Sequence, residues 1–219
     1  MQDRARIQVS YKGSQGSYVD SEVASVRTTE YDVNPLILNR WSPRAMTSEL
    51  LADEELMSLF EAARWAPSSY NNQPWRFIYA KRNTEHWDRL FNLLADFNKS
   101  WAKDAAVLVV IISGKNFEHN GSPSLTHQFD TGAAWQNLAL EATARDLVTH
   151  AMAGFDYENA RKALNIPDDY EVMAMAAIGK KGPKESLPPS LGEREFPSKR
   201  KPIKEFVMEG IFQSKPKLP

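Results

Sequence analysis

Two arginines flank a short hydroxyl-bearing segment, Arg40-Trp41-Ser42-Pro43-Arg44. If this segment is helical, side chains four residues apart point to the same side, and the serine adds a hydroxyl donor between them. Guanidinium groups stay charged and donate hydrogen bonds in pairs, so the set could hold a phosphate. Two solvated arginines at the start of a helix would have the same spacing. The segment alone therefore leaves both an anion site and a plain surface open.

A second polar stretch, APSSYNNQPWR at residues 66–76, combines two prolines with two serines, two asparagines and a glutamine. The prolines restrict the backbone, and the amides and hydroxyls can both donate and accept hydrogen bonds. A rigid loop of this kind could read the edge of a planar heterocycle. An ordinary connector between a helix and a strand would use the same residue types in its turns. The two segments, separated by one amphipathic helix, are more specific together than either is alone.

The bulk composition limits the classes of partner. The chain has 219 residues, 42% of them hydrophobic, which is enough for one substantial core. Its 27 Lys+Arg and 28 Asp+Glu give a net charge of -1, so no overall field draws it to nucleic acid or to an acidic membrane. The longest apolar run, residues 105–112, is too short to cross a bilayer, and the N-terminus lacks an apolar signal segment. We expect a cytoplasmic protein with no nucleic-acid or membrane partner.

Thiol and metal chemistry are disfavoured by the residue types present. The chain has no cysteine, which excludes disulfides, thiolate nucleophiles and zinc-thiolate sites. The four histidines, at positions 86, 119, 127 and 150, do not have the spacing of a metal site. We therefore expect no metal.

Hydrophobic periodicity indicates helices and strands that alternate along the chain. Between residues 53 and 65, apolar residues recur at i, i+3, i+4 and i+7, with Asp53 placed to cap the helix. The continuous apolar run at 105–112 predicts a strand covered on both faces, at the centre of a sheet. Further helices are predicted from residue 84, over 126–147 and over 157–164, and further strands over 75–80 and 172–179. This interleaving indicates a layered α/β or α+β domain with helices against a sheet.

The two polar segments, in this order, resemble motifs of the FMN-dependent nitroreductase family. RWSPR is similar to the R-x-S-x-R segment near the start of that family, and APSSYNNQPWRF is similar to its A-P-S-x-x-N-x-Q-P-W signature. AGFD at residues 153–156 is similar to a later G-F-D turn. The resemblance covers residues 38–208, nearly all of the periodic chain. It implies an α+β fold with a central, mostly antiparallel sheet flanked by helices, in an intertwined homodimer.

The resemblance also implies a site for non-covalently bound FMN. The residues that would hold its phosphate and ribityl chain are Arg40, Trp41, Ser42 and Arg44. The residues that would reach the flavin of the neighbouring subunit are Pro67, Ser68, Ser69 and Asn71, with Gln73. The other positions that match flavin contacts are Asn98 at the ring edge, the turn Met152, Ala153 and Gly154 on the N5 side, and Arg200 near the phosphate.

In such proteins the flavin carries the chemistry, so no side chain is expected to be catalytic. NADPH or NADH would reduce the flavin, and a small planar acceptor such as a nitroaromatic, a quinone or an activated alkene would take the electrons in a ping-pong mechanism. A dehalogenase, a flavin-consuming enzyme or an FMN oxidase of the same fold remains open. So does a protein that binds or senses flavin without turnover.

Residues 35–210 are interpreted as the FMN-binding domain, residues 1–34 as an N-terminal arm, and residues 211–219 as an extended tail, because two prolines there preclude a helix. Trp41 and Trp101 are expected to lie closer to the flavin than the other tryptophans. His127 and Phe129, by the same resemblance, could face the substrate, or they could be an exposed helix end.

Overall fold

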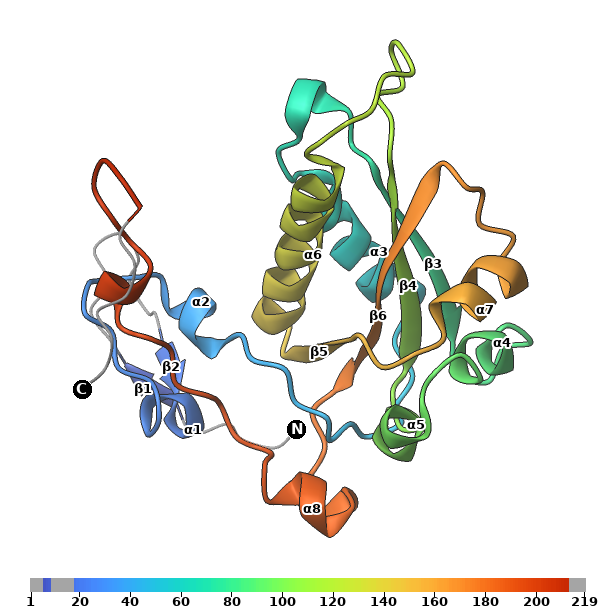
Figure 1. Ribbon diagram of the computed structural model, residues 1–219. Coiled ribbons are helices and arrows are strands. Elements are labelled where there is room, and N and C mark those ends of the chain that lie inside the picture. Colours follow the sequence, from blue (N-terminus) through green and yellow to red (C-terminus); the bar gives the residue numbers. More distant parts are fainter. Residues whose placement is uncertain (1–5, 9–17, 213–219) are drawn as a thin grey trace, which may run out of the picture. The chain divides into compact units, whose positions relative to one another are not determined.

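The computed structural model describes residues 6–8 and 18–212. The chain forms two compact units, one from Met1–Asn39 with Phe196–Pro219 and the other from Arg40–Glu195. Figure 1 shows the elements of both units, coloured along the sequence. The division of the chain into an arm, an FMN-binding domain over residues 35–210 and a tail stays a prediction.

The smaller unit combines segments from both ends of the chain. Its elements are β1 (Arg6–Gln8) paired antiparallel with β2 (Tyr18–Asp20), then α1 (Ser21–Ala24), α2 (Pro35–Asn39) and the 3-10 turn η3 (Ile203–Glu205). The Nε of Arg27 donates to the carbonyl of Ser198 at 3.1 Å, and the amide of Ile203 donates to Oε1 of Glu30 at 2.9 Å. These bonds tie the C-terminal segment to the N-terminal one. Most of the predicted tail, residues 213–219, lies outside the described residues, as do residues 1–5 and 9–17 of the predicted arm.

The larger unit is built on a four-stranded antiparallel sheet in the order β3-β4-β6-β5. The strands are β3 (Trp75–Lys81), β4 (Val107–Gly114), β5 (Leu147–Met152) and β6 (Tyr170–Lys180). Within β4, Val110 pairs with Ile78 of β3 on one side and with Met175 of β6 on the other. The apolar run at 105–112 thus forms an interior strand, as predicted.

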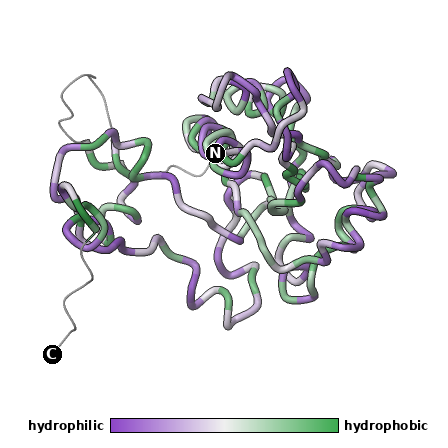
Figure 2. The backbone as a smooth tube through the Cα atoms, turned by 45° about the horizontal axis from the view of Figure 1, so that its top comes forward, coloured by the Kyte–Doolittle hydropathy of each residue, from purple (hydrophilic) through white to green (hydrophobic). Residues whose placement is uncertain are grey.

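Alternate residues of β4 enter two separate hydrophobic clusters, because successive side chains of a strand point to opposite faces. Val107, Val109 and Ile111 pack with α3 (Asp53–Arg64) and α6 (His127–Ala144). Leu108, Val110 and Ile112 belong to the cluster that includes residues of α4 (Trp87–Phe91), α5 (Asp96–Ala102), α7 (Tyr157–Ala163) and α8 (Pro189–Gly192). Figure 1 shows α3 and α6 on one face of the sheet and α4 and α7 on the other. The helices alternate between hydrophilic and hydrophobic residues along their turns (Figure 2), as amphipathic cover for a sheet requires.

Two short 3-10 turns complete the larger unit, η1 (Ser69–Asn71) and η2 (Lys184–Ser186). The predicted α+β class, with a central antiparallel sheet flanked by helices, is confirmed by this architecture. The predicted homodimer stays a prediction.

The prediction of a helix over 126–147 is wrong at its end. The helix α6 stops at Ala144, and residues 147–152 form the strand β5, which was not predicted. Asp146 has a φ of 59°, a left-handed conformation that breaks the helix and reverses the chain. The β-branched Val148 and Thr149 are then buried on β5, which pairs with β6. The charged pair Arg145-Asp146 interrupts the apolar pattern at this boundary, but no glycine or proline marks the end of the helix in the sequence.

Two helix starts also differ from prediction. Asp53 is the first residue of α3 rather than its cap, which is Ala52; together with Glu54 and Glu55 it places negative charge at the positive end of the helix dipole. The helix expected from residue 84 begins at Trp87, after a turn in which the Oγ1 of Thr84 donates to the carbonyl of Lys81.

Candidate functional site

The RWSPR segment is not helical. Residues 41–45 have no regular secondary structure, and the segment leads into an antiparallel bridge between Met46 and Lys181. The premise that a helix would bring Arg40 and Arg44 to the same side is therefore wrong. The Nη1 of Arg40 lies 3.5 Å from Oγ of Ser42, so one guanidinium and the hydroxyl do meet.

Arg44 carries a polar group that the described structure leaves unsatisfied. Its side chain is half-buried, and its Nε is buried with no hydrogen-bond partner among the described residues. A buried donor without a partner costs on the order of 1–3 kcal/mol. An anion would satisfy this donor. The neighbouring Trp41 is half-buried, and the Nζ of Lys181 lies 4.9 Å from its ring centroid.

Two side chains that the sequence reading did not select hold the backbone of this segment. The Oε1 of Glu195 accepts hydrogen bonds from the amides of Arg44 at 2.6 Å and Ala45 at 2.8 Å. The Nδ1 of His150 lies 2.7 Å from the carbonyl of Ser42 and 3.2 Å from that of Pro43. Neither residue carried a signal in the sequence, because both are more than 100 positions away from the segment.

The environment of His150 keeps its imidazole neutral. Burial and, to a smaller extent, the charge of Arg44 lower its pKa from 6.5 to about 4, although the hydrogen bonds to the carbonyls of Ser42 and Pro43 partly oppose the shift. Because carbonyl oxygens only accept, Nδ1 must carry the proton and Nε2 is the acceptor of the ring.

The second predicted segment is a strained, exposed loop. Tyr70, Asn71 and Gln73 have φ values of 52°, 53° and 49°, in the left-handed region that residues other than glycine seldom adopt. The Oγ of Ser68 accepts from the amide of Gln73 at 3.0 Å, and Oδ2 of the buried Asp130 accepts from the amide of Ser69 at 3.1 Å. Strain of this kind concentrates at functional sites, where the surrounding structure holds it in place.

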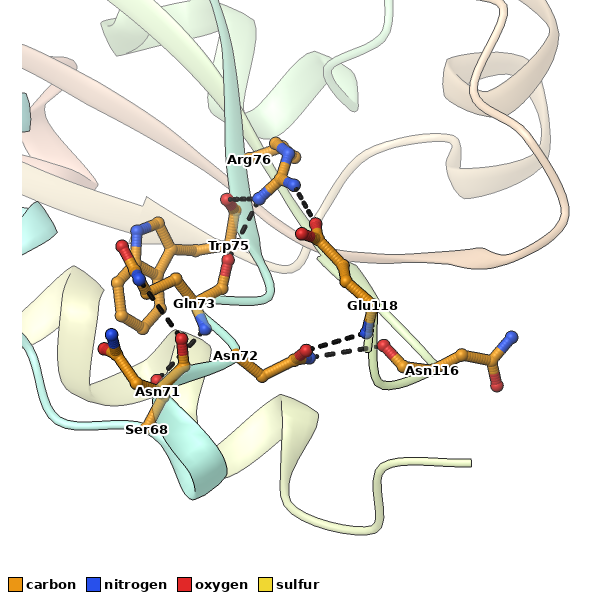
Figure 3. A network of polar contacts seen from close by, with 8 residues as sticks. All are labelled: Ser68, Asn71, Asn72, Gln73, Trp75, Arg76, Asn116 and Glu118. Atoms are coloured by element: carbon orange, nitrogen blue, oxygen red, sulfur yellow. Dashed lines mark hydrogen bonds and ion pairs between the residues drawn. The ribbon is translucent and has the colours of Figure 1, made fainter. Parts of the chain in front are cut away.

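A network of polar contacts ties this loop to residues 116–118 (Figure 3). Asn72 uses both ends of its amide: Nδ2 donates to the carbonyl of Asn116 at 3.2 Å, and Oδ1 accepts from the amide of Glu118 at 2.9 Å. Arg76 pairs with Glu118 at 2.7 Å and donates to the carbonyls of Gln73 and Trp75. The loop is therefore rigid even though Pro67 and Asn71 are exposed.

An open hollow of about 370 Å³ adjoins this network. Its lining residues are Tyr70, Asn71, Asn72, Gln73, Arg76, Glu118 and His119. Tyr70 is 83% exposed, and its ring packs edge-on against Phe117 with centroids 5.6 Å apart. The loop thus presents aromatic and amide groups outward rather than into its own core.

The predicted residues of the N5-side turn lie beside Asn98. The Nδ2 of Asn98 donates to the carbonyl of Gly154 at 2.9 Å. Met152 is buried, whereas Ala153 and Gly154 are exposed. The structure thus brings Asn98, on α5, together with the turn that follows β5. Contact of these residues with a flavin stays a prediction.

Trp101 lies in the core beside Asn98, and its expected closeness to the flavin stays a prediction. Its side chain is 1% exposed, and its Nε1 donates to Oδ1 of Asn98 at 3.2 Å. It is a core residue, packed with its ring 4.7 Å from that of His150, and it has no face to offer a ligand.

The remaining predicted positions are Arg200, His127 and Phe129. Arg200 belongs to the smaller unit, is exposed, and donates to Oγ of Ser198 at 2.7 Å. Phe129 is 81% exposed, while Nδ1 of His127 lies 2.9 Å from Oγ of the buried Ser113. Across residues 6–8 and 18–212, no three His, Asp or Glu residues are grouped as a metal site, and no helix in those ranges is long and apolar enough to span a membrane.

Comparison with known proteins places these segments in a family context. A profile of the Nitroreductase family matches residues 37–100 and 94–180. The chain is 32% identical over 158 residues to Protein DrgA of Synechocystis sp., covering 60% of this chain and 75% of that protein. It is 40% identical over 70 residues to the oxygen-insensitive NADPH nitroreductase of Helicobacter acinonychis, which is 31% of each chain.

Comparison with solved structures also finds FMN-containing proteins. The chain is similar to the crystal structure of an oxidoreductase containing FMN, with a TM-score of 0.83 and 43% identity, over 86% of this chain and 97% of that one. It is also similar to a candidate nitroreductase in complex with FMN from Desulfovibrio desulfuricans, with a TM-score of 0.63 and 26% identity, over 84% and 100% of the two chains. The family profile covers well over half of the chain and includes both polar segments. This protein therefore belongs to the Nitroreductase family.

Proposed function

We propose that this protein is an FMN-dependent oxidoreductase that uses NADH or NADPH to reduce a small planar acceptor, such as a nitroaromatic, a quinone or an activated alkene. The observation that carries the cofactor assignment is the Nε of Arg44, which is buried with no hydrogen-bond partner in the described part of the chain, in a segment whose backbone is held by Glu195 and His150. A phosphate carrying nearly two negative charges would satisfy this donor, and the guanidinium of Arg40 and the hydroxyl of Ser42, which lie 3.5 Å apart, would add further donors. Similarity to structures that contain FMN supports the same assignment.

The other residues of the proposed FMN site divide between two subunits. In the same chain they are Trp41, Asn98, Met152, Ala153, Gly154 and Arg200. From a second copy they are Pro67, Ser68, Ser69, Asn71 and Gln73. The exposure of Tyr70 and Asn71 supports this division, because an outward-facing rigid loop can serve a neighbouring molecule better than its own core.

Exposed apolar side chains support a homodimer. Trp65 at the end of α3, Leu125 just before α6 and Phe129 in its first turn are 73%, 96% and 81% exposed. Where such side chains form one contiguous patch, they mark a surface that binds another protein.

FMN, when bound, supplies the redox chemistry by taking a hydride from the reduced nicotinamide and passing the electrons on to the acceptor. The side chains of the protein then bind and orient, and no acidic, basic or nucleophilic side chain is required. This suits a chain that contains no cysteine.

The test begins with the visible absorption spectrum of the purified protein, before and after addition of FMN. It continues with anaerobic stopped-flow mixing with NADH and, separately, NADPH. We expect a flavin spectrum that bleaches much faster than free FMN. A colourless protein that ignores added FMN would overturn the assignment. Bound flavin that is reduced no faster than free FMN would instead favour the flavin-binding protein without turnover.

A further inference from the structure

The backbone of residues 42–45 is held from two directions by side chains that lie far away in the sequence. Glu195, three residues after the end of α8, receives the amides of Arg44 and Ala45. His150, in the middle of β5, bonds to the carbonyls of Ser42 and Pro43. Four consecutive residues thus have one polar backbone group each bound by a side chain.

The carboxylate of Glu195 takes up two successive amides that could otherwise face an anion. Its side chain is only 5% exposed, and its Oε2 is buried without a partner among the described residues. Within the described structure the Glu195 carboxylate forms no ion pair with Arg44, so it does not neutralise the charge of that guanidinium. A buried carboxylate bound to amides at 2.6 and 2.8 Å fixes the backbone strongly, since charge-assisted bonds are short and strong. The anion must then be met by the side chains of this segment.

His150 binds the first half of the segment, Ser42 and Pro43, and these contacts fix the tautomer of its ring. Its two partners are carbonyls, which only accept, so Nδ1–H is directed at them. The ring is itself held, because it packs against the buried Trp101 and because β5 is paired with β6.

The end of the segment, at Ala45 and Met46, packs closely against the backbone of Gly182. The amide of Gly182 donates to the carbonyl of Ala45 at 2.8 Å, and a Cβ at Gly182 would lie 2.8 Å from the backbone of Met46. The segment is thus pressed against the end of β6. The backbone of residues 42–45 is therefore held by the side chains of Glu195 and His150 and, at Ala45, by the amide of Gly182.

We propose that Glu195 and His150 are positioning residues that set the geometry of the phosphate grip formed by Ser42 and Arg44. This rests on the proposed function, in which FMN is the ligand. The two residues should then affect binding of the phosphate end of the ligand and not binding of its ring. Their loss should therefore remove the preference for FMN over riboflavin, which has the same ring and no phosphate.

The experiment measures dissociation constants of FMN and riboflavin by quenching of flavin fluorescence, for the full-length apoprotein and its variants. Glu195→Ala and His150→Phe remove the two contacts. Glu195→Gln keeps an oxygen that can accept from the amides, and His150→Asn keeps a side-chain N–H near the position of Nδ1. Glu193→Ala is the matched control for charge, because Glu193 is exposed two residues away, and His86→Phe is the matched control for the ring.

We expect Glu195→Ala and His150→Phe to weaken FMN binding by about tenfold to a hundredfold, the range found when a residue that orients a metal ligand is lost. Riboflavin binding should change by less than about threefold, so the ratio of the two constants falls. Glu195→Gln, His150→Asn and both controls should keep the wild-type ratio. A change that merely loosens the fold would weaken both flavins alike and leave the ratio unchanged, and that result in folded variants would overturn the inference.

Two further outcomes separate the inference from the proposed function. If the wild-type protein binds neither flavin, the proposed function is wrong and the inference falls with it. If the wild type prefers FMN and both folded variants keep that preference, the inference alone is wrong. If circular dichroism shows that Glu195→Ala does not fold, Glu195→Asp is measured instead. Aspartate keeps the charge but is one methylene shorter, so this variant should also reduce the preference for FMN over riboflavin.

Discussion

Asn98 and Gly154, 56 residues apart, are joined by a hydrogen bond of 2.9 Å from the side-chain amide to the main-chain carbonyl. The same carbonyl accepts the amide of Ala95 at 3.0 Å. This bond brings α5 against the turn after β5, two places that the family resemblance suggested for a flavin site. It also explains why residue 154 is glycine, because a Cβ there would lie 2.7 Å from Nδ2 of Asn98.

Gly154→Ala should destabilise the protein. The added methyl group must displace the amide of Asn98, which breaks its bond to residue 154, and we expect the free energy of unfolding to fall by about 1–3 kcal/mol. Urea unfolding followed by circular dichroism measures this. Gly132→Ala, within α6, is the control: nothing lies within 4 Å of the new methyl group, so helix propensity should raise stability by about 0.5–1 kcal/mol. Equal effects at the two sites would contradict this account.

The left-handed conformation of Gln73 should restrict which residues are tolerated at this position. Its φ is 49°, which a β-branched residue adopts only with strain. Gln73→Val should lower the free energy of unfolding by about 1–2 kcal/mol, whereas Gln73→Gly should change it by less than about 0.5 kcal/mol, because glycine adopts this φ freely. Denaturation midpoints at equal m-values provide the comparison. If valine is tolerated as well as glycine, the loop does not hold this conformation in solution.

Stability should depend on the protonation of His150 in a defined pH window. Because the folded-state pKa, about 4, lies below the ordinary value of 6.5, the unfolded chain binds the proton more tightly. The contribution of this group is therefore complete above pH 6.5 and is lost as the pH falls from 6.5 towards 4. The shift corresponds to a loss on the order of 3 kcal/mol.

Urea titrations of the wild type and of His150→Asn between pH 4 and 7.5 isolate this contribution. Asparagine does not titrate, so the difference in stability between the two proteins should shrink as the pH falls. A difference that stays constant over the whole range would show that His150 does not titrate with a lowered pKa.

Arg44→Ala should weaken FMN binding if the guanidinium holds the phosphate. Loss of one charge-assisted interaction costs about 1.5–3 kcal/mol, which raises the dissociation constant about tenfold to a hundredfold. The increase in melting temperature that saturating FMN produces in the wild type should shrink accordingly. Arg64→Ala is the control, because Arg64 is an exposed residue of α3 whose charge pairs with Glu61, three residues earlier, and lies over the ring of the neighbouring Trp65. Unchanged FMN binding in Arg44→Ala would remove this residue from the site.

The sequence by itself determined the local features of this protein. The i, i+3, i+4, i+7 pattern predicted α3, and the continuous apolar run predicted β4, because both depend on residues that are close along the chain. The two polar segments were visible as motifs, and they suffice to recognise the family.

Only the tertiary structure decided how the site is held. The RWSPR segment lacks regular structure, and its shape comes from Glu195 and His150, which no local pattern connects to it. The strand β5 exists because Asp146 takes a left-handed turn and because β6 offers an edge to pair with. The physical reason is common to both cases: hydrogen bonds and burial between distant residues form only when the whole chain packs, so they leave no periodic trace in the sequence.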